Sequence, residues 1–183
     1  MKPLYLQNYL ENPNELYNAL LSLDWLNVTE ARREYFMSLT PRNYTYGKGV
    51  GQREYQSNPF SESIKKILDK LNDSFNLFGD NVYRNDKYNV CFLNRYDAGK
   101  NQLGWHRDDV DGTIAVISLG AEREIWWKLQ EEKGVVPFEN RQKLASGSLF
   151  IMPAGFQGKY FHKIPRSDRE CGTRISLTFR EYR

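Results

Sequence analysis

The sequence predicts a mainly β fold, namely a sandwich, barrel or jelly roll with helices flanking it on the N-terminal side. From residue 89 onward, short runs rich in β-branched and aromatic residues alternate with turns that contain Gly, Asp or Pro. No helical period lies between these runs, so there is no crossover segment to build a parallel sheet. A content of 40% hydrophobic and 14% aromatic residues is typical of a packed globule. The expected strands are 89–96, 113–119, 124–129, 142–144, 148–152, 160–163 and 174–180.

Two helices are expected before this β-rich part. The first begins at Pro13, because proline is favoured in the first turn of a helix, and leucines at 16, 20 and 23 follow at helical spacing. The second begins near Ser61 and ends before Gly79. Its buried face should consist of Ile64, Ile67, Leu68, Leu71 and Phe75. We expect both helices to pack on the outside of the strands.

The length of 183 residues is that of one domain. We expect a single domain over 1–183, with the helices and a lid in about 1–88 and the β core in about 89–183. Residues 41–59 are rich in Tyr, Gly, Asn and Arg and have no helical period. This composition indicates an irregular hairpin or a lid.

Charge and hydropathy limit the partners only weakly. The formal net charge is +3 with scattered Lys and Arg, which permits nucleic-acid binding without demanding it. The N-terminus has no continuous apolar run and no later segment approaches the length of a membrane span, so we expect an intracellular protein (cytoplasm, or nucleus in a eukaryote) with no membrane partner. Cys91 and Cys171 match no metal-binding spacing and are expected to be reduced thiols.

Histidine occurs only twice, and both copies fit an iron site. His106 and Asp108 form a His-x-Asp pair, and His162 lies far downstream. Two histidines and one carboxylate are the ligand set that binds non-haem Fe(II) on one face and leaves the opposite positions open. An oxygen-dependent enzyme is therefore the first hypothesis.

The last expected strand has a polar face that suggests an anionic ligand. Alternation along 174–180 places Arg174, Ser176, Thr178 and Arg180 on one side and apolar residues on the other. Facing solvent, the two arginines would be ordinary surface charges. Facing the inside of a jelly roll, they need a dianion, because an unpaired buried charge is very costly. Their spacing of ~20 Å along a strand suits two extended arginine side chains with a five-carbon dicarboxylate between them.

Taken together, these blocks resemble the AlkB family of Fe(II)/2-oxoglutarate dioxygenases. The similar stretches are collinear and cover most of the chain from about residue 41 to 180; they are 94–99, 106–109, 117–123, 146–149 and 174–180. The resemblance implies a double-stranded β-helix, or jelly-roll, core with His106, Asp108 and His162 on iron. It also implies that 2-oxoglutarate is held by Asn94, Tyr96, Arg174 and Arg180, with Ser176 and Thr178 on the same strand face.

The activity that the resemblance implies is oxidative demethylation of nucleobase nitrogens. Fe(II), 2-oxoglutarate and O2 would be consumed to give succinate and CO2, with formaldehyde released from a base of the 1-methyladenine or 3-methylcytosine type; ascorbate is an expected aid in vitro. The expected partner is alkylated DNA, with RNA as a further candidate substrate, and a monomer is expected. Two alternatives stay open: hydroxylation of a protein or small molecule, and non-catalytic binding of modified nucleic acid.

Residues 41–59 resemble the family's nucleotide-recognition lid. This implies that Tyr55 and Tyr46 stack on an extruded base, that Arg42 contacts a phosphate or the base, and that Asp109 contacts the cationic methylated base. The alternative is that the tyrosines pack the hairpin onto the sheet. The chain departs from many relatives in having Val110 directly after the Asp-Asp pair, with an acidic residue only at 111.

The tryptophans are expected to be structural. Trp126 and Trp127 lie on a core strand, where one of the two must face inward, and both are interpreted as packing residues. Trp105 should point away from the iron, because it precedes His106 on an extended segment.

Overall fold

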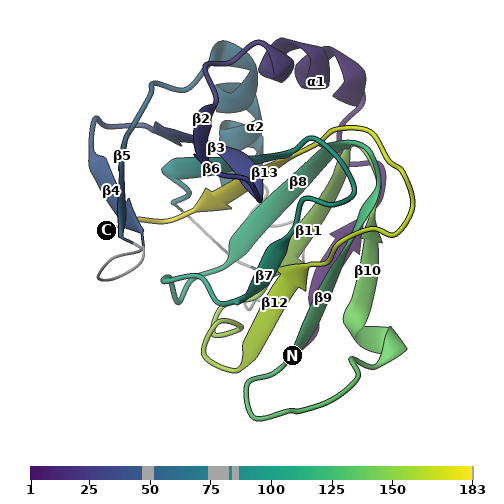
Figure 1. The fold of residues 1–183 in the computed structure, drawn as a ribbon. Coiled ribbons are helices and arrows are strands. Elements are labelled where there is room, and N and C mark those ends of the chain that lie inside the picture. Colours follow the sequence, from purple (N-terminus) through teal and green to yellow (C-terminus); the bar gives the residue numbers. More distant parts are fainter. Residues whose placement is uncertain (47–51, 74–82, 84–86, 183) are drawn as a thin grey trace.

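The structure, a computed structural model, describes residues 1–46, 52–73, 83 and 87–182. Within these ranges the strands form two large antiparallel sheets and one hairpin (Figure 1). The larger sheet has the order β1-β11-β8-β13-β6-β3-β2 and the smaller one the order β10-β9-β12-β7. The larger sheet comprises β1 (Leu4–Leu6), β2 (Leu26–Thr29), β3 (Arg32–Ser38), β6 (Val90–Tyr96), β8 (Ile114–Gly120), β11 (Ser148–Met152) and β13 (Arg174–Arg180). The smaller sheet comprises β7 (Leu103–His106), β9 (Arg123–Leu129), β10 (Arg141–Leu144) and β12 (Tyr160–Ile164), and the hairpin β4 (Asn43–Tyr46) and β5 (Arg53–Gln56).

The two sheets pack face to face around a shared apolar cluster. Val116 and Phe150 from the larger sheet contact Ile125, Trp127 and Ile164 from the smaller one within this buried cluster. Opposed antiparallel sheets with alternating inward residues form the sandwich geometry of a jelly roll. The predicted fold class is confirmed.

Two helices cover the outer face of the larger sheet, as expected. Helix α1 (Pro13–Leu21) begins at the proline, and helix α2 (Glu62–Asp73) follows Ser61. Leu20 and Leu68, one from each helix, are buried in a second apolar cluster together with Leu177 of β13. The expected end of the second helix near residue 79, and Phe75, lie outside the described residues. No helix that the structure describes is both long enough and apolar enough to cross a membrane.

Strand β13 is buried on both faces because helices cover one side and the smaller sheet covers the other. Its apolar residues Ile175, Leu177 and Phe179 face the helices. Its polar residues therefore face the interior of the sandwich, and Arg174 and Arg180 are only 1% and 8% exposed. The solvent-facing alternative for these arginines is wrong.

The N-terminal part contributes more than helices and a lid. Strands β1, β2 and β3 all join the larger sheet, and β3 pairs with β6 over six residue pairs from Arg33 opposite Arg95 to Ser38 opposite Val90. The sequence did not indicate these strands, because β1 has only three residues and β3 carries charged residues on a buried face. Residues 41–59 do form a hairpin, β4–β5, although residues 47–51 lie outside the described part. Cys91 and Cys171 are free thiols, as expected.

Candidate active site

The three candidate metal ligands converge although 56 positions separate the two histidines in sequence. Strands β7 and β12 pair with His106 directly opposite His162, and the two imidazole centroids lie 4.1 Å apart. Asp108 follows two residues after His106, and one ligand atom from each of the three residues falls within 4.8 Å of the others. This donor set fits Fe(II) and leaves room for further ligands.

Backbone contacts orient two of these ligands. Nδ1 of His106 lies 2.8 Å from the carbonyl oxygen of Gly104, so Nε2 is left to face a metal. The backbone N–H of Asp108 donates a hydrogen bond to Oε1 of the buried Gln157 at 2.9 Å. Sequence reasoning missed Gln157, because a lone glutamine in a turn carries no motif.

The electrostatics of the cluster suit metal binding. Burial, and secondly the neighbouring His106 ring, lower the pKa of His162 to about 3; burial also lowers the pKa of His106. Burial alone raises the pKa of Asp108, but the Arg180 guanidinium and the two imidazoles outweigh it and hold that pKa below its usual value. Near neutral pH the site therefore presents two neutral imidazoles and one carboxylate, the protonation states that bind a metal.

All the residues expected to bind metal or cosubstrate line one internal cavity. This lining includes Asn94, Tyr96, His106, Asp108, His162, Arg174, Ser176, Thr178 and Arg180. The cavity measures about 40 Å³, which is room for roughly three water molecules. It is narrow because the Arg180 side chain turns back onto Asp108, with Nη2 2.5 Å from Oδ1.

Arg174 is a buried cation without a carboxylate partner among the residues described. Its Nη2 donates a hydrogen bond to Oγ of Ser118 at 2.8 Å, and its guanidinium lies 5.3 Å from the centroid of the Tyr96 ring. Nε and Nη1 have no hydrogen-bond partner in the described part of the chain. Burial lowers the pKa of Arg174 to about 10, and the neighbouring Tyr96 side chain opposes this effect only in part. An anion in this cavity would meet two free donors.

The Asn94 amide is oriented by a buried ion pair. Nε of Arg32 donates to Oδ1 of Asn94 at 2.8 Å, and Nη2 of Arg32 lies 2.5 Å from Oε1 of Glu34. The amide oxygen is thereby occupied, so the NH2 group of Asn94 remains the donor available to a ligand. The pair was missed from sequence because Arg32 and Glu34 look like surface charges until β3 is placed inside the larger sheet.

The lid tyrosine Tyr55 packs instead of offering a stacking face. Its ring is 1% exposed and belongs to an apolar cluster with Phe36 and Phe92. Its hydroxyl donates a hydrogen bond to Oε2 of Glu34. The interpretation of Tyr55 as a base-stacking residue is therefore corrected in this structure: the packing alternative describes it. The side chain of Tyr46 lies outside the described residues.

Asp109 faces two other tyrosines. The hydroxyl of Tyr182 donates to Oδ2 of Asp109 at 3.1 Å, and that of Tyr44 donates to Oδ1 at 3.4 Å. Arg42 is held in the same corner, because its Nη1 donates to the backbone carbonyl of Tyr182 at 3.1 Å. Tyr182 was missed, although it follows Arg180 by two positions and two-residue alternation could have pointed to it.

A hollow of about 380 Å³ lies beside this corner. It is lined by Asp109, Val110, Asp111, Gly112, Glu181 and Tyr182. A volume of this order suits a small-molecule or base-sized ligand. Three carboxylates at its wall favour a cationic one.

The tryptophans divide between the two faces of the smaller sheet. Trp127 is buried and lies 5.9 Å from Phe150, so its packing role is confirmed. Trp126 is on the opposite, outer face and belongs to none of the buried apolar clusters; it packs against Arg141 and Lys163 instead. Trp105 is 37% exposed and adjoins His106 on the edge strand.

Comparisons with known proteins agree with this site. A protein-family model described as "2OG-Fe(II) oxygenase superfamily" matches residues 10–180. The chain is 28% identical to DNA oxidative demethylase ALKBH2 of Bos taurus over 63% of its length and 32% identical to the Mus musculus ALKBH2 over 51%. It is 28% identical over 75% of its length to the human alpha-ketoglutarate-dependent dioxygenase alkB homolog 3. These alignments cover 43%, 43% and 47% of the relatives, so the chain spans less than half the length of the curated relatives it matches.

The fold is similar to that of the solved structure of OsALKBH1. The TM-score is 0.65 at 16% sequence identity, with 98% of this chain and 97% of that chain covered. The relatives named ALKBH2 and alkB homolog 3 confirm the resemblance to the AlkB family, and the solved structure shows the shared fold. Because the superfamily match runs through every candidate metal and cosubstrate residue, the chain belongs to the 2OG-Fe(II) oxygenase superfamily.

Proposed function

We propose that this protein is an Fe(II)/2-oxoglutarate-dependent demethylase of N-alkylated bases in DNA. Bases of the 1-methyladenine or 3-methylcytosine type are the expected lesions, with methylated RNA as a second nucleic-acid substrate. The observation that supports 2-oxoglutarate as the cosubstrate is the position of Arg174. Its guanidinium is buried, lacks a counter-ion among the described residues and faces the same cavity as His106, Asp108 and His162.

The site residues have separate roles in this proposal. His106, Asp108 and His162 would hold Fe(II), and Arg174 would bind a carboxylate of 2-oxoglutarate through its unpaired N–H donors. The iron, when bound, supplies the oxidising chemistry. The protein's own residues set the geometry: Gln157 holds the Asp108 backbone, and the inner faces of both sheets exclude bulk water from the cavity.

The base would enter through the hollow beside Asp109. A base methylated at such a ring nitrogen is cationic, and Asp109, Asp111 and Glu181 all line that hollow. Tyr182 gives an aromatic wall at the same place, whereas Tyr55 is packed away. The departure at Val110 does not remove the acidic character, because Asp111 lies next to it in the lining. The proteins named as DNA oxidative demethylases support DNA as the substrate.

Direct turnover tests the proposal. The protein is incubated with Fe(II), 2-oxoglutarate and a panel of methylated DNA and RNA oligonucleotides, and base mass, formaldehyde and succinate are measured together. Demethylation with matching formaldehyde and succinate is the expected result. Oligonucleotide binding without succinate would instead identify a non-catalytic binder, and succinate formation indifferent to every nucleic acid would identify a hydroxylase of proteins or small molecules. We also propose that the protein is a monomer and acts inside the cell. Sedimentation analysis tests its oligomeric state.

A further inference from the structure

The outer face of the smaller sheet carries a line of alternating cations and tryptophans. Each strand of this sheet contributes: Arg141 from β10, Trp126 and Lys128 from β9, Lys163 from β12 and Trp105 from β7. Register brings them together, since Trp126 is the direct cross-strand partner of both Arg141 and Lys163. We call these five residues the basic aromatic strip.

Every cation of the strip lies against an indole ring. The Arg141 guanidinium lies 4.3 Å and the Lys163 ammonium 4.6 Å from the centroid of Trp126. Lys163 and Lys128 also lie 4.7 and 5.0 Å from the centroid of Trp105. Four strands at about 4.8 Å spacing make the strip roughly 14 Å long from β10 to β7. The contacts hold both rings in fixed orientations on the sheet surface.

The cations of the strip have no carboxylate partner in the part of the chain that the structure describes. Across the residues that the structure describes, none of Arg141, Lys128 and Lys163 forms an ion pair; Lys128 donates only to the backbone carbonyl of Glu132, at 3.0 Å. Lys163 shares the Trp126 ring with Arg141 and the Trp105 ring with Lys128, so like charges are crowded here. The acidic residue beside the strip, Glu124, accepts a hydrogen bond from Nε1 of Trp126 at 2.6 Å.

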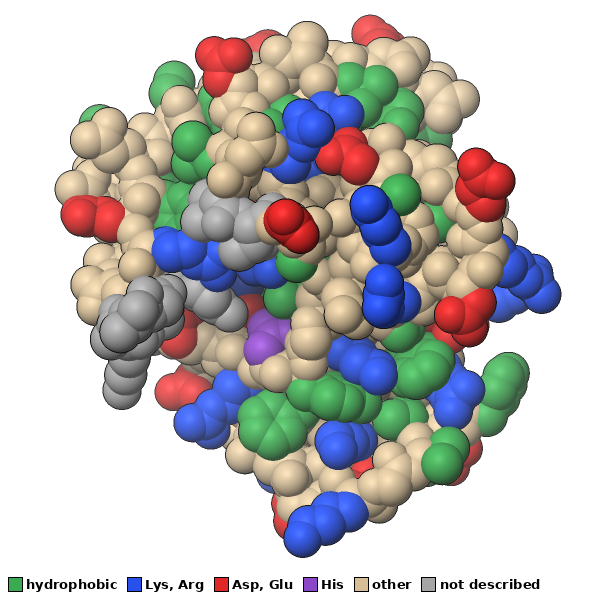
Figure 2. Space-filling view, viewed as in Figure 1, with side chains coloured by type: hydrophobic (Ala, Val, Ile, Leu, Met, Phe, Trp, Pro, Cys, Tyr) green, Lys and Arg blue, Asp and Glu red, His purple; other side chains and the backbone are tan. Residues whose placement is uncertain are grey.

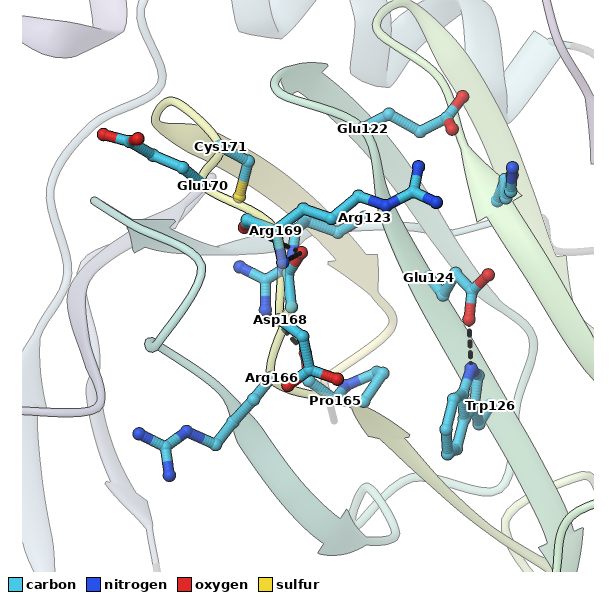
Figure 3. Close-up of a pocket in the computed structure, with 12 residues that line it drawn as sticks. Glu122, Arg123, Glu124, Trp126, Pro165, Arg166, Asp168, Arg169, Glu170 and Cys171 are labelled. Carbon is cyan, nitrogen blue, oxygen red and sulfur yellow. Dashed lines mark hydrogen bonds between the residues drawn. The ribbon is translucent and has the colours of Figure 1, made fainter.

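The figures show how far the basic and aromatic side chains extend on this face. Figure 2 shows Lys and Arg side chains interleaved with hydrophobic ones over the region where Figure 1 draws β7, β12 and β9. A hollow of about 600 Å³ adjoins Trp126. Figure 3 shows Glu122, Asp168 and Glu170 among the arginines that line it. Acidic and basic side chains balance in the lining of that hollow, so it does not share the excess positive charge of the strip.

The strip and the His-Asp-His cluster occupy opposite faces of the same strands. On β12 the ligand His162 points inward and Lys163 outward, and on β7 His106 follows Trp105. β7 is the edge strand of the smaller sheet, and Trp105 lies on it. A ligand that crosses the strip toward β7 therefore reaches the rim that carries His106.

We propose that the basic aromatic strip binds a single-stranded stretch of DNA next to the base that enters the active site, with phosphates on the cations and bases packed against the ring surface of Trp126 and Trp105 that the cations leave exposed. Sequence-independent binding of single strands uses this combination of a cationic track and aromatic faces. The uncompensated charge fits a polyanion, and the flat indoles select one that also carries rings. This inference rests on the proposed function for its substrate, and it goes beyond it by naming a second contact surface.

The test measures the affinity for an unmethylated strand, without iron or 2-oxoglutarate. Fluorescence anisotropy of a short labelled oligothymidylate is recorded against wild type and strip variants at several salt concentrations. Trp126→Ala and Trp105→Ala should each weaken binding roughly 5- to 150-fold, the loss expected for one stacked base. Lys163→Gln should reduce the slope of log affinity against log salt by about 0.7, the value for one phosphate contact on a single strand, and Lys163→Arg should retain it.

Controls separate this surface from general charge and from misfolding. Lys66→Gln removes an exposed cation on α2, remote from the smaller sheet, and should leave affinity and salt slope unchanged. Thermal unfolding midpoints check that every variant is folded. Wild-type affinity in all the strip variants would overturn the proposal, as would equally tight binding of poly-glutamate, which carries charge without rings.

The same preparations distinguish this proposal from the proposed function. If methylated oligonucleotides are demethylated but the folded strip variants bind like wild type, the strip proposal alone is wrong. If oligothymidylate binds through the strip but no methylated base is ever repaired, the strip stands and the demethylase assignment fails.

Discussion

Arg180 donates a hydrogen bond from Nη2 to Oδ1 of Asp108 at 2.5 Å, while Oδ2 of the same carboxylate lies 3.7 Å from Nε2 of His162. One oxygen of Asp108 is therefore bound to the Arg180 guanidinium, and the other lies toward His162. Asp108 raises the pKa of Arg180 above its ordinary value despite the opposing effect of burial. The two cavity arginines thus differ: Arg180 has an internal counter-ion, whereas Arg174 has none among the described residues.

This difference predicts separate effects of the two arginines. Arg174→Ala should raise the 2-oxoglutarate requirement roughly 10- to 150-fold, the loss of a charge-assisted hydrogen bond, and leave Fe(II) affinity nearly unchanged. Arg180→Ala should weaken both, because Asp108 loses its partner. The measurements are 2-oxoglutarate titrations of succinate formation and equilibrium Fe(II) titrations. Identical profiles for the two variants would contradict the assignment.

The metal ligands themselves are predicted to be required for turnover and dispensable for folding. His106→Ala, Asp108→Ala and His162→Ala should each abolish succinate formation and weaken Fe(II) binding, because three protein ligands are the minimum facial set. The apolar clusters on both faces of the larger sheet do not depend on these side chains, so far-UV circular dichroism should stay native. Full activity in any one folded variant would remove that residue from the ligand set.

Gln157 is predicted to act on the metal through the backbone of Asp108. Gln157→Ala removes the acceptor of the Asp108 N–H group and should weaken Fe(II) binding about 10- to 100-fold, the range observed for outer-shell partners of metal ligands. The 2-oxoglutarate requirement at saturating Fe(II) should change little. A variant that loses stability but binds Fe(II) like wild type would show that Gln157 is only structural.

Tyr55 is predicted to matter through its hydroxyl group. Tyr55→Phe leaves the buried Glu34 carboxylate without one donor and should lower the free energy of unfolding by about 1–3 kcal/mol. Tyr55→Ala also empties ring volume and should cost about 3–5 kcal/mol, as for other buried aromatic residues. Tyr83→Phe is the matched control, because its hydroxyl donates to the Lys2 carbonyl at an exposed site. Urea unfolding measures the free energy of unfolding of each variant. If Tyr55 served only in base stacking, Tyr55→Phe would be as stable as wild type.

The sequence by itself determined the β-rich core and the chemistry of its cavity. Strict alternation along 174–180 predicted which side of β13 is polar, since side-chain direction on a strand follows from local geometry alone. The scarcity of histidine likewise restricted the metal ligands to His106 and His162. These features depend on residue type and spacing, which a sequence displays directly.

Only the tertiary structure decided the partners of the charged and aromatic residues. Arg32 and Glu34 read as surface charges until β3 pairs with β6, and Tyr55 reads as an exposed lid residue until the hairpin packs on Phe36 and Phe92. Arg180 and Asp108 are 72 positions apart, and Trp126 meets Lys163 only because β9 and β12 are neighbours. Which cation pairs with which acid or ring depends on strand order and register, and these follow from long-range packing that no local pattern encodes.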